Sequence, residues 1–239
     1  MLVSHERPVP VQNRLLAALP AEDFERLRPH LEVVRLLTRQ TVYKSREPIT
    51  HLYFPQMCMV SLVALADGSA TVEVATVGND GVVGLPIFLG ADRIVGQAVC
   101  QIPGPALRIE AGIFREQMGV GSRLHALLQA YTLALLTLIA QTAACNRLHS
   151  MAQRCARWLL MTHDRVGVEE FPLTQEFLAQ MLGVRRASVT GAAGVLQKAG
   201  WIQYRRGQIT VVDRAGLETA CCECYRIITD EFDRLFAGV

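Results

Sequence analysis

The stretch "LAQMLGVRRASVTGAAGVLQKAGWIQYRRGQITVVD", residues 178–213, decides the fold. Two helices that cross closely need a small residue under the crossing, a glycine at the turn and apolar residues between them. Counted from Gln175, the small residue is Ala179, and the glycine, which is free to adopt a positive φ, is Gly183. The apolar positions between the helices are Leu178, Leu182, Val184, Val189 and Ala192. This spacing predicts a helix-turn-helix.

The residues that flank the two helices predict a winged helix. Thr174 is a good N-cap for the first helix. The second helix is expected to run from Arg185 to Lys198 and to stop at Ala199-Gly200, because glycine is the usual residue just beyond a helix end. After it, "WIQY" and "QITVVD" flank Arg205-Arg206-Gly207 and predict a β-hairpin with these three residues at its tip.

Positive charge is concentrated in this segment. Residues 174–207 hold five Lys and Arg against Glu176 alone, a net charge of +4, whereas the whole chain of 239 residues carries +2 and the remainder therefore −2. The N-terminal end of a recognition helix enters the major groove of DNA, and a hairpin tip reaches flanking phosphates. Double-stranded DNA is the expected partner. The candidate DNA-binding residues are Thr174, Gln175, Arg185, Arg186, Ser188, Thr190, Lys198, Arg205 and Arg206.

The N-terminal half is rich in short β-type segments. After an opening helix at about 13–27, such segments lie between residues 31 and 109, separated by turn signals such as Asp67-Gly68 and Pro103-Gly104-Pro105. Short strands at close spacing are typical of an antiparallel barrel or roll, and with the helices they give an α+β fold class. The expected strands are "LEVVRL", "TVYK", "HLYF", "MVSLVAL", "TVEVATV", "IVGQAVCQI" and "ALRI".

One long helix, at about 113–149, is predicted between the two halves. Leucines and Tyr131 recur at helical spacing, and Leu136 and Ala140 widen the apolar surface beyond a single face. We expect the β-roll to cover one side and the same helix of a second subunit to cover the other, through residues 121–147. The alternative is a central helix that lies wholly inside a monomer.

Neither a secretory signal nor a membrane span is predicted. The N-terminus, "MLVSHERPVPVQNRLLAAL", carries charges and prolines where a signal peptide needs a continuous apolar core. The most apolar run, Leu124 to Ala140, contains His125 and Gln129 and is shorter than the roughly 20 residues that a span requires. We expect a cytoplasmic protein with no membrane partner.

Together, these features resemble the Crp/Fnr family of bacterial transcription regulators. The most specific part is "LTQEFLAQMLGVRRASVTGAAGVLQKAGWIQYRRGQITV", residues 173–211, which looks like the family's DNA-binding signature. The resemblance implies a cyclic-nucleotide-binding-like β-roll sensor domain (1–112), a dimerisation helix (113–149) and a winged helix-turn-helix DNA-binding domain (150–239). It also implies a homodimer that binds a palindromic operator.

The recognition helix departs from the family pattern at two base-reading positions. The family typically carries an arginine, then a glutamate, then a second arginine four residues after the glutamate. Arg186 matches the first arginine, but Ala187 stands at the glutamate and Gly191 at the second arginine. The family's usual operator is therefore not expected. Arg186 is the candidate to contact a guanine edge.

The region of the effector site also departs from the family pattern. Cyclic-nucleotide binders of the family carry a glycine and a glutamate for the ribose, then an arginine and a Ser or Thr for the phosphate. Here Leu85 follows Gly84, and Val95-Gly96-Gln97 stands at the arginine pair, so that Arg93 is the only cation nearby. A buried phosphate without a charged partner binds poorly, so no cAMP response is expected. The candidate residues of an effector pocket are Gly84, Leu85 and Arg93.

The seven cysteines do not show zinc-finger spacing. The Fnr branch holds an iron–sulfur cluster on N-terminal cysteines, whereas the first cysteine here is Cys58. A final helix is predicted after Asp213, with Cys221 and Cys224 on its apolar stripe and Cys222 as a surface thiol. A redox or metal switch is the alternative for these cysteines. We predict no metal and no cofactor.

The sequence shows no catalytic constellation. The six histidines are far apart, and H-E-x-x-H, G-x-S-x-G and phosphate-binding loop motifs do not occur. We therefore expect a DNA-binding transcription regulator rather than an enzyme. The alternative is a ligand-binding sensor whose winged helix contacts protein, since Ala187 and Gly191 cannot read bases. RNA polymerase and an unidentified small-molecule effector are further candidate partners.

Overall fold

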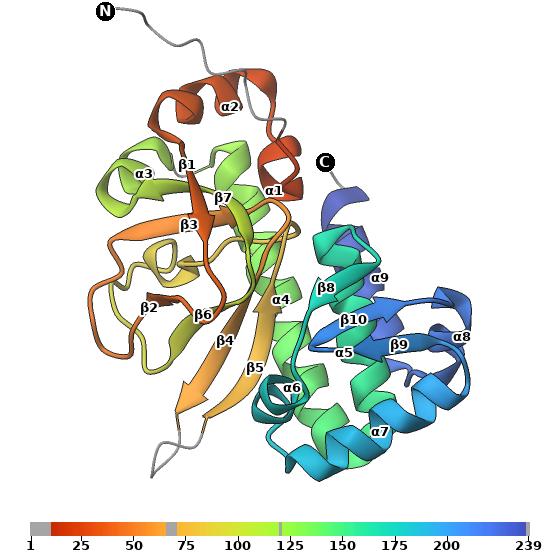
Figure 1. The fold of residues 1–239 in the computed structure, drawn as a ribbon. Helices are drawn as coiled ribbons and strands as arrows, with labels where there is room; N and C mark the ends of the chain where they lie inside the picture. The colour runs from red at the N-terminus through yellow and green to blue at the C-terminus, as the bar shows by residue number, and fades with distance from the viewer. Residues whose placement is uncertain (1–10, 66–70, 120, 238–239) are drawn as a thin grey trace, which may run out of the picture.

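The computed structural model describes residues 11–65, 71–119 and 121–237. An N-terminal β-roll and a C-terminal group of helices with a small sheet lie on either side of a long helix (Figure 1). The predicted α+β class, with an antiparallel roll, a long helix and a winged helix-turn-helix, is confirmed. The predicted turn at Asp67-Gly68 lies outside the described residues.

Two antiparallel sheets form the roll, with strand orders β1-β7-β3 and β2-β6-β4-β5. In β3, Leu52 and Phe54 are buried and pair with Ile109 and Leu107 of β7, so alternate residues of both strands face one core. The strands are β1 (Glu32–Leu36), β2 (Thr41–Tyr43), β3 (His51–Pro55), β4 (Met59–Leu65), β5 (Thr71–Val77), β6 (Gln97–Ile102) and β7 (Gly104–Glu110).

Two of the predicted helices are each divided in the structure. The opening helix consists of α1 (Arg14–Ala17) and α2 (Ala21–Leu27), because Pro20 between them cannot continue a helix and stands at the N-cap of α2. The helix expected at 113–149 consists of α3 (Ala111–Gln117) and α4 (Arg123–Leu148). Gly119 and Gly121 lie between these two, and the φ of Gly121 is +84°.

The helix α4 lies in the core between the roll and the C-terminal helix α9 (Cys224–Ala237). Its Tyr131 is buried, and the Tyr131 ring meets Phe232 of α9 edge-on at 6.3 Å. Ile228 and Leu235 of α9 join the same core. By length and composition alone α4 could also cross a membrane, but apolar core helices of soluble proteins have the same properties. In this fold its apolar residues contact protein on two sides.

The last predicted helix is also divided, and its cysteine assignment was wrong. Leu217 of α8 (Arg214–Ala220) packs in the C-terminal core, whereas α9 packs on the core of the roll, so the chain turns between them. Cys222, which was expected at the surface, lies in this turn with 5% of its surface exposed. Its Sγ is 3.5 Å from the Sγ of Cys145, while Cys221 is only half-buried.

The C-terminal part contains the predicted helix-turn-helix and hairpin. Its core helix α5 begins with a capping box formed by Ser150 and Gln153, and Gly167 stands at its C-cap. The hairpin strands form a sheet with a third strand, in the order β8-β10-β9. The elements are α5 (Met151–Val166), β8 (Glu170–Pro172), α6 (Gln175–Met181), α7 (Arg186–Lys198), β9 (Ile202–Arg205) and β10 (Gln208–Val211).

Buried polar contacts fix α5 to the roll. The indole N–H of Trp158 donates to Oε1 of Glu73 in β5 at 3.0 Å. The guanidinium of Arg165 forms an ion pair with Asp80 at 2.8 Å, and 4% and 10% of these side chains are exposed. The position of the helix-turn-helix relative to the roll is therefore held by groups that lose their partners if α5 moves away.

Candidate nucleic-acid interface

The turn between α6 and α7 presents the second helix to solvent. Thr174 caps α6 by accepting from the N–H of Phe177 at 3.2 Å, and Gly183 at the turn has a φ of +65°. Buried Ala179 lies in α6, and the predicted apolar set packs beneath the crossing, buried except for half-buried Val184. The helix α7 begins at Arg186, one residue later than expected, because Arg185 has extended backbone angles at the N-cap.

The outward face of α7 combines polar side chains with small residues. Arg186, Ser188, Thr190 and Lys198 are exposed along it. A Cβ added at Gly191 would meet nothing within 4 Å, so the side of the helix at this position is open. The backbone of α7 can therefore approach a groove more closely than a helix with long side chains at every outward position.

The hairpin brings a second pair of arginines beside α6. Arg206 and Gly207 have φ values of +50° and +78°, the left-handed angles that a tight two-residue hairpin turn requires. The carbonyl of Gly207 accepts from the N–H of Leu173 at 2.8 Å, which places the hairpin tip next to the start of α6. Arg205 and Arg206 are exposed at this tip.

A surface hollow of about 350 Å³ joins the three elements. It is lined by Thr174, Gln175, Arg186, Tyr204 and Gly207. Burial raises the pKa of Tyr204 to about 12, whereas the charge of Arg186 lowers it, so the phenol stays protonated and donates to the carbonyl of Leu173. Tyr204 was not predicted from the sequence. An aromatic residue directly before the arginine pair was the available signal.

Thr190, one of the predicted contact residues, is hydrogen-bonded to another of them. The hydroxyl of Thr190 donates to Oε1 of Gln175 at 2.7 Å and thus links the two helices. The same hydroxyl lies 3.1 Å from the carbonyl oxygen of Arg186, so its proton is used inside the protein, while the amide N–H₂ of Gln175 remains as a donor. The hydroxyl of Thr190 thus holds the side chain of Gln175 in place.

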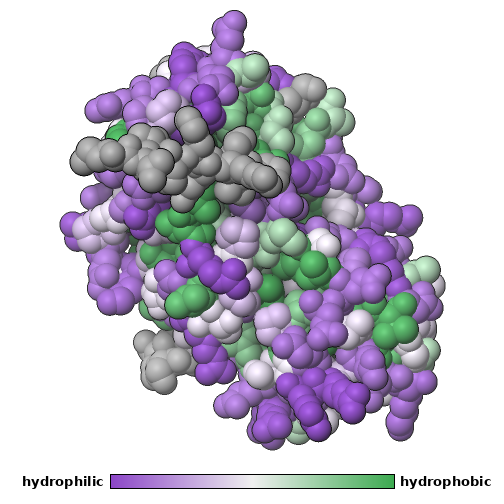
Figure 2. Space-filling model, turned by 45° about the horizontal axis from the view of Figure 1, so that its top comes forward, coloured by the Kyte–Doolittle hydropathy of each residue, from purple (hydrophilic) through white to green (hydrophobic). Residues whose placement is uncertain are grey.

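Five cations of the segment carry uncompensated charge. Other arginines are paired, for example Arg108 with Glu32 and Arg214 with Asp164. Within the described ranges, no ion pair is formed by Arg185, Arg186, Lys198, Arg205 or Arg206. Figure 2 shows hydrophilic side chains along the lower edge of the molecule, in the C-terminal part. A positive field without internal partners is suited to a polyanion.

The structure brings together two of the three predicted effector-pocket residues. Gly84 and Leu85 line a cavity of about 280 Å³ between the roll and α4. Arg93 does not line it: its side chain is exposed and lies 3.8 Å from Asp92 and 3.5 Å from the carbonyl of Arg46. Among the residues that the structure describes, no charged side chain lines this cavity.

Comparison with known proteins identifies the C-terminal segment. Residues 153–220 match the Crp-like helix-turn-helix domain. FixK2 from Bradyrhizobium japonicum is similar in structure, with a TM-score of 0.68 and 17% identity over 80% of this chain and 98% of FixK2. No curated protein matches the chain in sequence.

Two further solved structures share the fold. TTHB099, a transcriptional regulator of the CRP family from Thermus thermophilus, has a TM-score of 0.64 and 18% identity over 78% of this chain and 95% of its own. CLP, a c-di-GMP-responsive global regulator from Xanthomonas campestris, has a TM-score of 0.63 and 17% identity over 80% of this chain and 99% of its own.

These findings confirm the resemblance to the Crp/Fnr family. The segment 153–220 is a Crp-like helix-turn-helix domain, and the chain has the fold of Crp/Fnr regulators. Identities of 17–18% show the fold alone, so the support for DNA binding and transcription regulation comes chiefly from the helix-turn-helix domain.

Proposed function

We propose that the chain is a cytoplasmic, sequence-specific transcription regulator that binds a palindromic operator as a homodimer and does not respond to cAMP. The observation that carries this proposal is the group of five unpaired cations on the exposed face of a Crp-like helix-turn-helix and its hairpin. None of these cations forms an ion pair with a described acidic side chain, so their charge is available to a polyanion.

The proposed contacts divide into base reading and phosphate binding. Arg186, in the first turn of α7, reads a guanine edge, and Ser188 lies within reach of either bases or phosphates. Arg185 and Lys198 hold phosphates at the two ends of α7, and Arg205 and Arg206 hold the flanking backbone. Thr174 and Gln175, at the start of α6, complete the phosphate contacts, with Thr190 positioning Gln175.

The proposed dimer uses the uncovered face of α4. An exposed stripe remains there although α9 and the roll cover the other faces, and 53% of Leu133 and 58% of Leu136 are exposed. The stripe repeats every seven residues, as the seam of a two-helix coiled coil does. It consists of Ala126, Gln129, Leu133, Leu136, Ala140 and Ala143. Its alanines allow two copies of α4 to approach closely.

The cavity beside α4 is the proposed effector site. Its lining is mostly apolar, from Tyr43 and Leu62 of the roll to Leu135 and Ile139 of α4. A cyclic phosphate in this cavity would have no cationic partner among the described lining residues and would be bound poorly. An apolar ligand matches the lining, and calorimetric titration with cAMP should show no binding.

Selection of bound sequences from a random duplex pool tests the function. The expected result is a two-fold symmetric consensus with half-sites about 10 base pairs apart, as for two recognition helices in successive grooves. If four cations per chain bind phosphates, the affinity of the dimer should fall with salt with a logarithmic slope of roughly −7.

Single substitutions distinguish base-reading residues from phosphate-binding residues and test the alternative function. Arg186→Ala should relax selectivity at one position per half-site, whereas Lys198→Ala should weaken all duplexes alike and reduce the salt slope. Arg35→Ala, which removes an exposed arginine from β1 of the roll, is the matched control. It should change neither the sequence selectivity nor the salt slope. No duplex binding at low salt would favour the alternative, a sensor whose winged helix contacts protein.

A further inference from the structure

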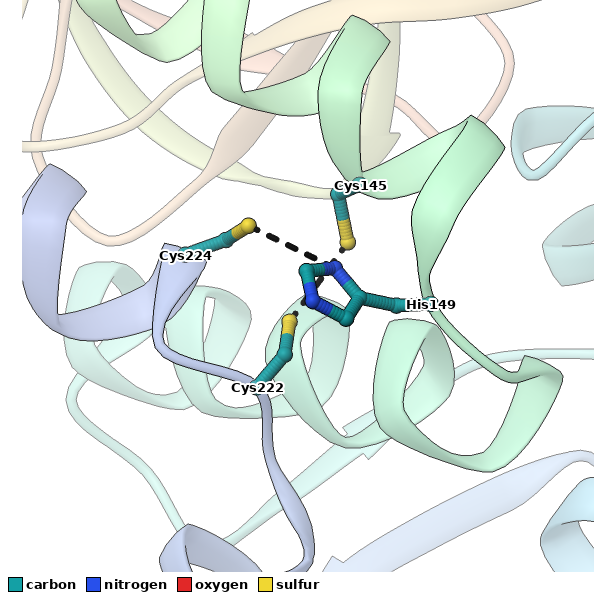
Figure 3. A group of neighbouring side chains, drawn as sticks. All are labelled: Cys145, His149, Cys222 and Cys224. Carbon is teal, nitrogen blue, oxygen red and sulfur yellow. Dashed lines mark hydrogen bonds between the residues drawn. The ribbon is translucent and has the colours of Figure 1, made fainter.

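A cluster of three thiols and one imidazole joins the end of α4 to the start of α9 (Figure 3). Cys145 and His149 lie four residues apart, on the last turn and the C-cap of α4. Cys222 lies in the turn before α9, and Cys224 is the first residue of α9. One atom capable of binding a metal from each residue lies within 4.8 Å of all the others.

We propose that Cys145, His149, Cys222 and Cys224 form a tetrahedral site for one thiolate-preferring divalent metal ion, Zn²⁺. Three cysteines and a histidine are one of the ligand sets of structural zinc sites. The site lies apart from the DNA-contacting face and from the effector cavity, so it goes beyond the proposed function.

The spacing of the ligand atoms fits a single ion. Two sulfurs bonded to one tetrahedral zinc at its usual bond length stand about 3.8 Å apart. The Sγ atoms of Cys145 and Cys222 are 3.5 Å apart, and Sγ of Cys224 is 3.6 Å from Nδ1 of His149. In a [4Fe–4S] cluster each ligand binds a different iron and the ligands stand farther apart, so one ion matches this cluster better.

The orientation of His149 also fits metal binding. Its Nδ1 faces the sulfurs, and its Nε2 is 3.2 Å from Oε1 of Glu223. A histidine that binds zinc usually donates its other ring N–H to a carboxylate, which fixes the ring and its tautomer. Only 14% of the His149 side chain is exposed, whereas 66% of Glu223 is exposed, so this edge connects the cluster to solvent.

A buried cation matches the charge of the occupied site. Three thiolates and one Zn²⁺ leave one net negative charge. Arg157 is 4% exposed and interacts electrostatically with Cys145 and Cys224. Its Nε has no hydrogen-bond partner among the described residues. A negatively charged metal centre would compensate this buried guanidinium.

A disulfide explains less of the arrangement. The seven cysteines are free in the structure, and a Cys145–Cys222 bond would have to shorten the 3.5 Å separation to about 2.05 Å. It would also leave Cys224, His149 and Glu223 without a role. The metal uses all four side chains and fixes α9 to α4 at the point where the chain turns into α5.

Metal titration of the full chain tests the proposal. The reduced protein is stripped with a chelator, and ZnCl₂ is added in competition with a chromophoric zinc chelator. We expect one ion per chain. Co²⁺ in place of Zn²⁺ should give intense visible bands of a tetrahedral ion and a sulfur-to-cobalt charge-transfer band. Cys145→Ser and Cys222→Ser should each abolish both signals.

Two further variants keep the test interpretable. Cys221→Ser is the matched control, because Cys221 packs against the cluster without being one of the four proposed ligands, and its Sγ faces the carbonyl of Gln153 at 4.0 Å. This variant should bind like the wild type. Glu223→Gln keeps every ligand and should weaken affinity roughly ten- to hundred-fold while keeping the tetrahedral spectrum.

Three results would overturn the proposal. One is a folded, reduced wild-type chain, verified by circular dichroism, that binds no ion. Another is equal binding by the wild type and Cys222→Ser. The third is a Cys145–Cys222 disulfide in protein purified under reducing conditions. If the cysteine variants do not fold, unchanged affinity in Glu223→Gln would also contradict the proposed geometry.

Discussion

The carboxyl group of Glu73 links the roll to α5 and should make this contact sensitive to pH. Its Oε1 accepts from Trp158, and its Oε2 lies 2.6 Å from the hydroxyl of Ser61. Burial raises the pKa of Glu73 to about 7, although hydrogen bonds from Ser61 and Trp158 and the charges of Arg157 and Arg165 lower it. The folded chain therefore favours the protonated acid below about pH 7.

The raised pKa of Glu73 makes the free energy of unfolding depend on pH. Because the pKa of Glu73 is raised on folding from 4.5 to about 7, its contribution to stability is complete below pH 4.5 and is lost as pH rises through 7. At 1.36 kcal/mol per pKa unit, the loss is on the order of 3 kcal/mol. A glutamine keeps both hydrogen bonds, as an acceptor for Trp158 and a donor to Ser61, and does not titrate.

Urea unfolding of the wild type and Glu73→Gln between pH 5 and 8 measures this effect. As pH rises, the free energy of unfolding of the wild type should fall relative to that of the variant, by up to about 3 kcal/mol. Glu116→Gln, which changes an exposed acid on α3, is the control and should follow the wild type. Parallel profiles for the wild type and Glu73→Gln would refute the reasoning.

Three further substitutions test other parts of the structure. Gly191→Ala adds a methyl group in open space within α7 and should raise the free energy of unfolding by roughly 1 kcal/mol in urea titrations. Leu136→Glu places a charge on the exposed stripe of α4 and should yield folded monomers in analytical ultracentrifugation. Arg165→Met leaves Asp80 buried without its partner and should cost about 3–5 kcal/mol in thermal unfolding, the typical loss for a broken buried pair.

The winged helix was predictable because its rules are local. The small residue, the glycine turn and the apolar spacing from Gln175 onward placed α7 correctly to within one residue. Pro20, Gly119 and Gly121 are local signals for the helix breaks, but the apolar periodicity on both sides predicts longer helices. The apolar periodicity indicates which residues are buried, but it does not indicate where a helix is interrupted.

The cysteine cluster was not predictable from local rules. A Cys-x-x-x-His pair at Cys145 and His149 and a Cys-x-Cys pair at Cys222 and Cys224 are present in the sequence. Cys145 and Cys222 are separated by 77 positions, and only the packing of α9 on α4 brings them together. The final helix was assigned to the C-terminal domain by sequence order, whereas its apolar face lies in the core of the roll.

The strand β5 connects the proposed effector cavity to the contact that holds α5. Val74 lines the cavity, while its neighbour Glu73 accepts from Trp158, since successive residues of a strand point to opposite faces. A ligand can move α5 only if it binds one arrangement of the two domains more tightly than the other. Reversing a 1:99 ratio between the two domain arrangements requires a ligand that binds one of them about 5.5 kcal/mol more tightly. This difference corresponds to about seven methylene groups that are buried in that arrangement only, at ~0.8 kcal/mol each. An apolar ligand of moderate size therefore has enough binding energy to act through β5, provided that the cavity fits it in only one of the two arrangements.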